Sequence, residues 1–422
     1  MITLLCIILV VPFFIFRPRD FFQPELFLNL YFIILIGLGP LALYAFRPDI
    51  FEKGNYNTVL LIIILGFSSI NAGFLAYDLI HKKFKTGRKT SLSKSSELFK
   101  EWAFRKRKSL RLVSIILTLS ALFAGSIYFF RAGQIPLLAF NKEEARVAAL
   151  AVSGNGYFLY ILTLGVISPA LMAMSYISKT RKLRLLRPIL LLATAAAFTL
   201  LLFTGSRRYS VWLCIYVLSI HHYMEKQISI KKFLLITIGG LLFINIFEMV
   251  RNPDSETTVD FLTTASYRLI IYISNLEKVF TAFIHHEKLF GSTLLMDLST
   301  ALPGKQIDYQ SWLKDIVGLE FEGFGIPPTI MGDLYINFGY PGIIFGCLAF
   351  GYLIKTIYQR QIVKGKSALG LLIYLSSLEI SSKIITSGLS AQTISMVWMA
   401  TIYSLIIIFI KLTSKARTQN EN

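Results

Sequence analysis

The chain has 422 residues, of which 55% are hydrophobic and only 16% are charged. This composition excludes a soluble enzyme and indicates an integral membrane protein. The formal net charge of +19 would suggest a nucleic-acid partner in a soluble protein, but the Lys and Arg residues here gather in the segments between apolar stretches. The three cysteines lie singly in apolar stretches, so no disulfide framework and no zinc or redox site is expected.

Apolar stretches follow one another along the whole chain, and a hydrocarbon core about 30 Å thick is crossed by roughly 20 apolar residues in a helix. We therefore predict an all-α polytopic membrane protein with about eleven transmembrane helices. The predicted spans are Met1–Phe16, Glu25–Phe46, Thr58–Ile80, Leu112–Phe130, Gly154–Ile177, Pro188–Thr204, Tyr209–Ile220, Phe233–Val250, Phe338–Ile357, Ala368–Ser387 and Thr393–Ile410.

The basic segment His81–Arg111 predicts the orientation of these spans. If it lies in the cytoplasm, the cytoplasmic segments hold more than twice as many Lys and Arg residues as the opposite side. The sequence thus predicts an N-terminus outside and a C-terminus inside, and the positive charge reports topology and attraction to anionic lipids. We expect the Ser- and Lys-rich segment itself to be partly disordered or to lie on the membrane surface.

One predicted outer loop is much longer than the others, and it divides the chain into residues 1–250 (helices 1–8), 251–337 (the loop) and 338–422 (helices 9–11 and a tail). Within the loop, apolar residues recur at helical spacing over Asp260–His285, which predicts an amphipathic helix at the membrane interface. A loop of this length is too long for a passive connector, so we expect the chemistry on the outer face.

Four arginines lie beside spans on the predicted outer side, against the positive-inside bias: Arg146, Arg207, Arg208 and Arg251. Each alone can be a lipid anchor or a local ion-pair partner. Together they can hold a pyrophosphate, because guanidinium groups bind phosphates through planar, charged, bidentate forks, and Gly205 lets backbone amides approach the anion.

Two opposite charges, Glu379 and Lys383, lie four residues apart inside the tenth predicted span. This spacing places them on one face of a helix, where they can form a mutual ion pair or mark an ion path in a transporter.

Three separated motifs of the chain resemble the Wzy-type oligosaccharide repeat-unit (O-antigen) polymerases. The resemblance is carried by Glu144-Ala145-Arg146 followed by Gly154-Asn155-Gly156-Tyr157, by Phe203-Thr204-Gly205-Ser206-Arg207-Arg208, and by Pro327-Pro328 leading to Gly332-Asp333-Leu334-Tyr335-Ile336-Asn337-Phe338-Gly339-Tyr340-Pro341-Gly342. The order of the motifs and the place of the large loop before the last three spans are also similar to that family.

The resemblance implies a metal-independent, inverting glycosyltransferase of the C-type membrane superfamily, without a cofactor. It would act on the extracytoplasmic face of the bacterial plasma (inner) membrane. The growing glycan would move en bloc from undecaprenyl pyrophosphate to the non-reducing end of a new lipid-linked repeat unit, for O-antigen, capsule or exopolysaccharide. A chain-length regulator and a flippase are the protein partners implied, and no nucleic acid is involved.

The resemblance carries over Arg146 and Arg207 as pyrophosphate contacts, with Arg208, Arg251 and Gly205 beside them. It also places Asp333 where the family motif often has an acid, so we predict Asp333 and Arg207 as catalytic residues.

Other predictions stay open at the level of sequence. Glu322, His285 and His286 are further candidates for the general base. An O-antigen ligase, which uses the same donor, and a lipid-linked oligosaccharide flippase or other secondary transporter are the alternative functions.

Overall fold

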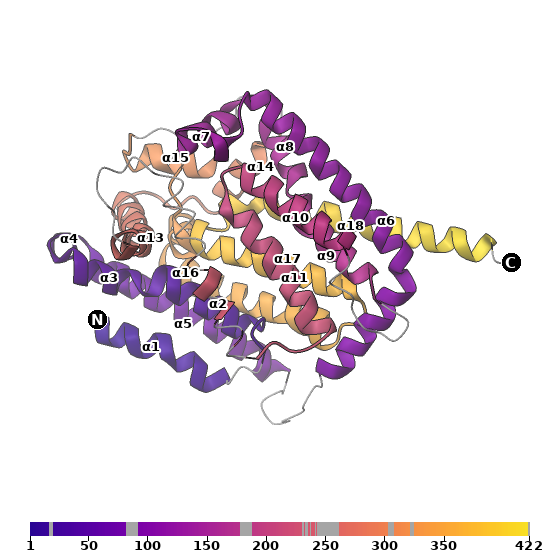
Figure 1. Cartoon of the computed structure of the whole chain (residues 1–422). Coiled ribbons are helices and arrows are strands. Elements are labelled where there is room, and N and C mark those ends of the chain that lie inside the picture. The colour runs from indigo at the N-terminus through magenta and orange to yellow at the C-terminus, as the bar shows by residue number, and fades with distance from the viewer. Residues whose placement is uncertain are drawn as a thin grey trace. The chain divides into compact units, whose positions relative to one another are not determined.

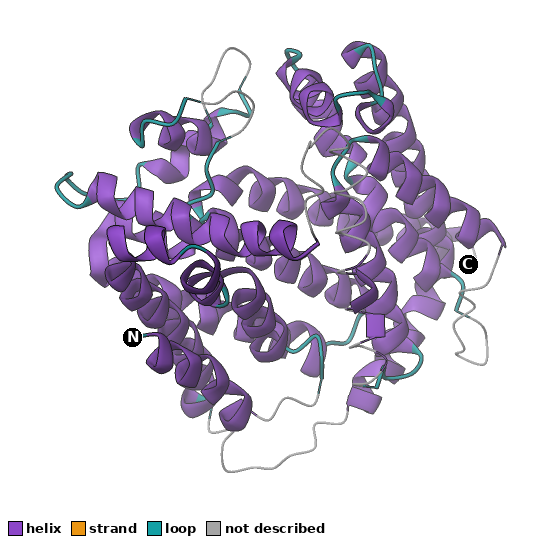
Figure 2. Ribbon diagram, turned by 60° about the vertical axis from the view of Figure 1, so that its left-hand side comes forward, coloured by secondary structure: helices purple, strands orange, loops and turns teal. Residues whose placement is uncertain are grey.

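The computed structural model describes residues 1–16, 20–81, 92–177, 188–229, some positions between 232 and 242, and residues 261–302, 308–320 and 325–420. Regular structure in these ranges is helical, and no β-strand occurs among them (Figures 1 and 2). Seven helices there are long and apolar enough to cross a membrane. The predicted all-α, multi-pass membrane protein is confirmed at this level.

Seven of the predicted spans coincide with these candidates: Pro24–Phe46, Tyr56–Ile80, Ser95–Ala132, Asn155–Ser175, Thr329–Val363, Ala368–Ser387 and Ser390–Thr413. The first and sixth predicted spans are the shorter apolar helices α1 (Ile2–Phe16) and α10 (Pro188–Phe203). The seventh lies within the helix α11 (Arg207–Met224). The eighth, Phe233–Val250, lies mostly outside the described residues. The total of eleven spans and the division at residues 250 and 337 stay predictions.

Contacts between residues divide the chain into two compact units, each assembled from separated stretches of sequence. Unit 1 comprises Met1–Lys89, Thr258–Tyr358 and Ser376–Met399, and unit 2 comprises Thr90–Thr257, Gln359–Leu375 and Ala400–Asn422. The helices α17 (Ala368–Ser387) and α18 (Thr393–Asn420) begin in one unit and end in the other.

The other elements of unit 1 are α1, α2 (Pro24–Phe32), the π-helical turn η1 (Ile33–Gly37), α3 (Gly39–Phe46), α4 (Pro48–Lys53), α5 (Tyr56–Ile80), α13 (Phe261–Phe283), α14 (Thr293–Ser299), α15 (Tyr309–Ile316), α16 (Thr329–Tyr358) and η4 (Ser390–Gln392). Its centre is the pairing of α5 with α16. Gly73 faces the backbone carbonyl of Leu348, and Gly351 faces that of Ile70, so a β-carbon at either glycine would collide with the opposite backbone. Small residues at this crossing allow the close approach on which membrane helices rely for packing.

A helix is confirmed where the amphipathic helix is predicted: α13, which belongs to unit 1. Its described apolar face includes the buried residues Ile273, Leu276, Val279 and Phe280. This face packs against α3 and α16. The position of α13 at a membrane interface stays a prediction.

The other elements of unit 2 are α6 (Leu92–Ala132), η2 (Pro136–Leu138), α7 (Lys142–Ala151), α8 (Asn155–Leu162), α9 (Leu164–Ser175), α10, α11 and the π-helical turn η3 (Gln359–Val363). The helix α9 is buried along its whole length, and α6 packs along α8 and α9. Ser114 of α6 donates a hydrogen bond of 2.7 Å to the carbonyl of Ser168 in α9.

The part of the basic segment from Leu92 to Arg111 is helical, because α6 begins at Leu92 and continues through the predicted span. Two ion pairs support this amphipathic part, between Lys100 and Glu97 at 3.0 Å and between Arg105 and Glu101 at 3.2 Å. Charged pairs at these spacings stabilise a helix, and apolar residues of the opposite face are buried, Phe99 among them. The prediction considered the number of basic residues in this segment and not the helical spacing of its charged and apolar residues.

Candidate functional site

The turn between α10 and α11 is built around Gly205, as the sequence motif predicts. Gly205 has φ +75°, a left-handed conformation that costs any residue with a β-carbon. The hydroxyl of the buried Thr204 donates to the carbonyl of Leu201 at 2.6 Å and accepts from the amide of Ser206 at 3.2 Å. The turn therefore ends α10 at a fixed point, and α11 begins at Arg207.

Arg146 of α7 lies directly against this turn, although the two motifs are about sixty residues apart in the chain. A β-carbon placed on Gly205 would be 3.6 Å from Cδ and 3.7 Å from Cβ of Arg146. The arginine stem thus covers the glycine, and Arg146 also lies within electrostatic range of the phenol of Tyr128. Arg146 and Arg207 are partly buried, whereas Arg208 is exposed. We call Arg146, Arg207 and Arg208 the arginine cluster.

The sequence of α7 explains why Arg146 is held in this position. Asn141 caps the helix: its side chain accepts from the Glu144 amide at 3.2 Å and donates to the Glu144 carboxylate at 3.0 Å. The same helix buries Ala145 and Ala149. This buried face fixes the rotation of α7 about its own axis, and it thereby fixes the direction in which Arg146, next to Ala145, leaves the helix.

The Gly154-Asn155-Gly156-Tyr157 motif joins α6, α7 and α8. The buried Asn155 side chain donates to the carbonyls of Tyr128 at 3.2 Å and Ala149 at 2.8 Å. Arg131, at the end of α6, donates to the carbonyl of Ser153 at 2.6 Å. Arg131 therefore lies where α6, α7 and α8 are joined. Sequence analysis did not select it, because a cation at the end of a helix is common.

Asp333 lies in unit 1, near the start of α16, and is 2% exposed. One carboxylate oxygen accepts from the Tyr309 phenol at 2.9 Å, the Ser390 hydroxyl at 2.8 Å and the Asn337 amide at 3.2 Å. The other accepts from the Ser390 backbone amide at 2.8 Å. Four donors from three segments of the chain therefore converge on one carboxylate.

The donors around Asp333 form a continuous chain of hydrogen bonds. The amide of Asn337 donates to the Thr293 hydroxyl at 2.7 Å, and the hydroxyls of Thr293 and Ser390 are 2.7 Å apart. Ser390 in turn donates to Asp333. The hydrogen bonds can therefore all run in one direction, from Asn337 through Thr293 and Ser390 to Asp333. Burial, together with the Asp333 carboxylate, raises the pKa of Tyr309 well above its usual value, so the phenol stays a donor.

The Gly339-Tyr340-Pro341 motif interrupts α16 just after this network. Gly339 has φ 67°, and Pro341 has no N–H to offer the carbonyl of Asn337. The amide of Phe290 donates to that carbonyl at 3.0 Å instead. The break thus fastens the segment before α14 to α16, and it places the Gly291 amide 2.9 Å from the Asn337 side chain.

The start of α16 carries backbone strain. Thr329, which follows Pro327 and Pro328, has φ 65° and is fully buried. A β-branched residue rarely adopts this left-handed conformation, and strain of this kind persists only where the surroundings impose it. Thr329 lies one helical turn before Asp333.

Asp297 of α14 is a carboxylate that sequence analysis did not select. It is 9% exposed, and its Oδ2 has no hydrogen-bond partner within the described part of the chain. Burial raises its pKa to about 6, Asp308 also raises it, and a hydrogen bond from the backbone of Ile394 opposes the shift. The stretch Thr-Leu-Leu-Met-Asp-Leu-Ser gave no signal of this, because the burial comes from tertiary packing.

The other predicted residues fall into two groups. His285 and His286 are exposed, next to the end of α13. Arg251 and Glu322 lie outside the described residues. Among the described residues, no three His, Cys, Asp or Glu side chains are grouped to hold a metal ion.

Two pairs of opposite charges are buried within candidate membrane spans. Lys383 and Glu379 are 2.6 Å apart and both are buried, which confirms the predicted ion pair. A second buried pair, Lys355 with Glu25, was not predicted, and Asp78 lies 3.5 Å from the same Lys355. Paired charges of this kind can be purely structural.

A protein-family model described as "Putative O-antigen polymerase" matches residues 20–397. The match covers the arginine cluster, α14 and the whole of α16. No curated protein and no solved structure matches the chain significantly.

Proposed function

Because the chain belongs to the O-antigen polymerase family, we propose that it extends a glycan by en bloc transfer from undecaprenyl pyrophosphate to a new lipid-linked repeat unit. The family implies a glycosyltransferase-like enzyme with lipid-linked oligosaccharide substrates. The seven apolar helices make it a multi-pass membrane protein. Its proposed place is the bacterial plasma membrane, with the reaction on the extracytoplasmic face.

The observation that carries the proposal is the packing of Arg146 on Gly205, which lies two residues before Arg207. Two partly buried arginines and an exposed one suit a pyrophosphate leaving group, whose charge grows as its bond to the sugar breaks. Stabilisation by arginines would let the transfer proceed without a metal ion. We propose Arg251 as a further pyrophosphate contact.

The proposed reaction is a direct displacement. A hydroxyl of the acceptor sugar attacks the anomeric carbon of the donor glycan, and the bond from that carbon to the pyrophosphate oxygen breaks with inversion. The hydroxyl proton passes to a general base. The products are the longer glycan on the acceptor's lipid carrier and free undecaprenyl pyrophosphate.

Two carboxylates are candidates for that base. Asp333 is the residue predicted from the motif, but its oxygens already accept four hydrogen bonds, which favours a positioning role at the start of α16. Among the described residues, Asp297 has one oxygen without a hydrogen-bond partner, and burial raises its pKa to about 6, close to neutral pH as a general base requires. We propose Asp297 as the base and Asp333 as the residue that positions α15, η4 and α16 relative to one another.

The alternative functions have less support. The family match favours a polymerase over a ligase. The flippase or transporter hypothesis rested on Glu379 and Lys383, which form a buried ion pair that can be purely structural. A flippase that delivers repeat units and a chain-length regulator are proposed as separate partners of the polymerase.

The direct test is a reaction with the purified protein in lipid nanodiscs and undecaprenyl-pyrophosphate repeat units as the only substrate. Products with a ladder of lengths, each on a lipid carrier, are expected. A product confined to one repeat unit, or a transfer that requires a lipid A core acceptor, would contradict the polymerase proposal.

A further inference from the structure

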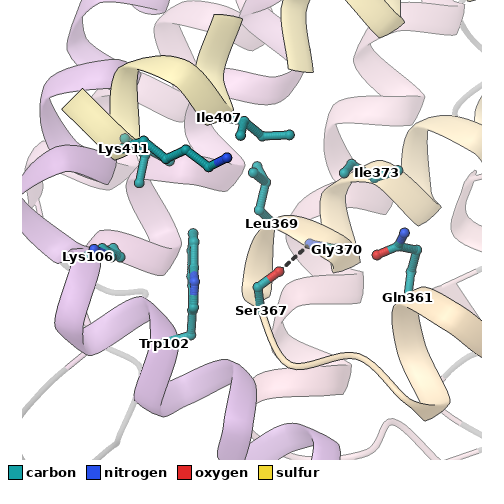
Figure 3. A pocket seen from close by; sticks show the side chains of 10 residues that line it. Trp102, Lys106, Gln361, Ser367, Leu369, Gly370, Ile373, Ile407 and Lys411 are labelled. Atoms are coloured by element: carbon teal, nitrogen blue, oxygen red, sulfur yellow. Dashed lines mark hydrogen bonds between the residues drawn. The ribbon is translucent and has the colours of Figure 1, made fainter. Parts of the chain in front are cut away.

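A pocket of about 280 Å³ opens in unit 2 between α6, α17 and α18 (Figure 3), and its lining contains no residue of the arginine cluster. Trp102 and Lys106 come from α6, and Ile407 and Lys411 from α18 (Figure 3). The remaining wall is formed by the turn before α17 and by its first residues. All of these residues belong to the same compact unit.

The shape of the pocket follows from a tight turn between η3 and α17. A β-carbon on Gly370 would be 2.6 Å from the side-chain oxygen of Gln361, and one on Gly365 would be 3.0 Å from the ring of Phe99. Ser367 accepts from the amide of Gly370 at 3.2 Å (Figure 3). The turn is thereby held against α6, and Gln361 and Ser367 line the pocket.

The lining combines two cations with an apolar floor. Lys106 and Lys411 supply the charges, and Trp102, Leu369, Ile373 and Ile407 supply the apolar surface. This combination does not suit a free polar ion, which would gain nothing from the apolar side. It suits a molecule with an anionic head and an apolar body.

The pocket also lies where α6 and α18 change from apolar to basic. Trp102 and Lys106 precede the apolar stretch of α6 that begins at Leu112, and Lys411 follows the apolar stretch of α18 that ends at Ile410. Both helices contain candidate membrane spans. Tryptophan and lysine at the end of a span mark the level of lipid headgroups, and basic pockets between helices on the cytoplasmic side bind anionic headgroups.

We propose that this pocket binds the headgroup of an anionic glycerophospholipid of the bilayer. Its phosphate lies between Lys106 and Lys411, and its glycerol and upper acyl chain lie against Trp102, Ile373 and Ile407. The volume accommodates the headgroup, while the acyl chains continue into the bilayer. This site is separate from the proposed pyrophosphate site and does not depend on the polymerase proposal.

Quenching of tryptophan fluorescence tests the proposal, because bromine on an acyl chain quenches only nearby indoles. The full chain has four tryptophans, so the signal of Trp102 is the difference between the wild type and Trp102→Phe. The two proteins are placed in nanodiscs of equal phosphatidylglycerol and phosphatidylcholine, with either one or the other lipid brominated. Binding predicts much stronger quenching of Trp102 by brominated phosphatidylglycerol, an enrichment of roughly fivefold or more per lysine.

The variants separate a built site from general attraction to charge. Lys106→Gln with Lys411→Gln should abolish the lipid preference, and Lys106→Arg with Lys411→Arg should keep it. Lys108→Gln, an exposed cation of the same helix, should leave it unchanged. Inorganic phosphate at tens of millimolar should not displace the lipid, since it lacks the apolar body.

Three results would overturn the proposal. Equal quenching of Trp102 by the two lipids would show that the pocket has no headgroup preference. A preference that persists in the double glutamine variant would assign it to the general surface charge. Displacement by phosphate would show an ion site in place of a lipid site.

Discussion

The side chain of Arg146 lies against Gly205, so the two motifs that carry the proposed pyrophosphate contacts form one packed corner of unit 2. A β-carbon at Gly205 would meet the arginine stem at 3.6 Å in a turn whose φ already excludes most residues. A distance of 3.6 Å is ordinary van der Waals contact, so the left-handed backbone of Gly205, and not a lack of room beside Arg146, is what favours glycine at this position.

Gly205→Ala is expected to shorten the polymer strongly. The left-handed backbone conformation costs alanine about 1–2 kcal/mol. The turn is expected to change its conformation to avoid this cost, and Arg207, which follows the turn, is then displaced. The measurement is the length distribution of the glycan at matched protein abundance. Gly156→Ala is the matched control, because a β-carbon there meets nothing within 4 Å. Normal polymer from Gly205→Ala would remove the packed corner from the mechanism.

Asp333→Asn should lower thermal stability and activity together, because the Tyr309 phenol, the Ser390 hydroxyl and the Ser390 amide all donate to the carboxylate. Hydrogen bonds to a charged group contribute about 1.5–3 kcal/mol each. Both the unfolding midpoint in detergent and the turnover are measured for each variant. Tyr309→Phe, which removes one donor, should show a smaller loss of both. Loss of turnover at an unchanged midpoint would instead support Asp333 as the base.

As the proposed general base, Asp297 should set the pH dependence of turnover through its pKa. A general base acts as the carboxylate, so turnover should rise with pH through about 6, close to tenfold per pH unit below that value, and then level off. Asp297→Asn should lower turnover by about two to four orders of magnitude and remove this limb of the profile. A wild-type profile that stays flat between pH 5 and pH 8 would exclude Asp297 as the base.

The buried pair of Lys355 and Glu25 predicts a stability effect separate from catalysis. Lys355→Met leaves the Glu25 carboxylate buried without its partner, which typically costs about 3–5 kcal/mol. Protein abundance and the unfolding midpoint should fall. Adding Glu25→Gln should restore much of the loss, because the uncompensated charge is then removed. An unfolding midpoint of Lys355→Met equal to that of the wild type would show that the pair contributes little.

Sequence patterns predicted the elements that depend on local signals. The bounds of α17, Ala368–Ser387, are those predicted from its apolar stretch, and the turn at Gly205 is where the glycine places it. The amphipathic spacing of Asp260–His285 likewise predicted α13. In each case periodicity or a backbone requirement is visible within one segment.

Relationships between distant segments were not predictable in this way. The donors to Asp333 come from Tyr309 and Ser390, which lie 24 and 57 residues away in the chain. The raised pKa of Asp297 arises from burial that its own helix does not reveal. The pair of Lys355 with Glu25 joins α16 to α2, and no spacing rule connects residues so far apart.

The most direct measurement of the proposed mechanism is the product of Arg207→Lys. A membrane anchor needs only a cation on a flexible stem, which lysine supplies as well as arginine. A bidentate contact to the leaving pyrophosphate needs the planar guanidinium, and charge-assisted bonds contribute about 1.5–3 kcal/mol each. Losing two such bonds in the transition state slows transfer by roughly two to four orders of magnitude, at about 1.4 kcal/mol per decade.

Arg207→Lys and Arg207→Ala should therefore both leave mainly single-repeat glycans at normal protein abundance. Arg105→Lys, an exposed arginine of α6 that pairs with Glu101, should make polymer of normal length. Polymer of wild-type length and amount from Arg207→Lys would contradict the pyrophosphate contact and leave Arg207 as an anchor.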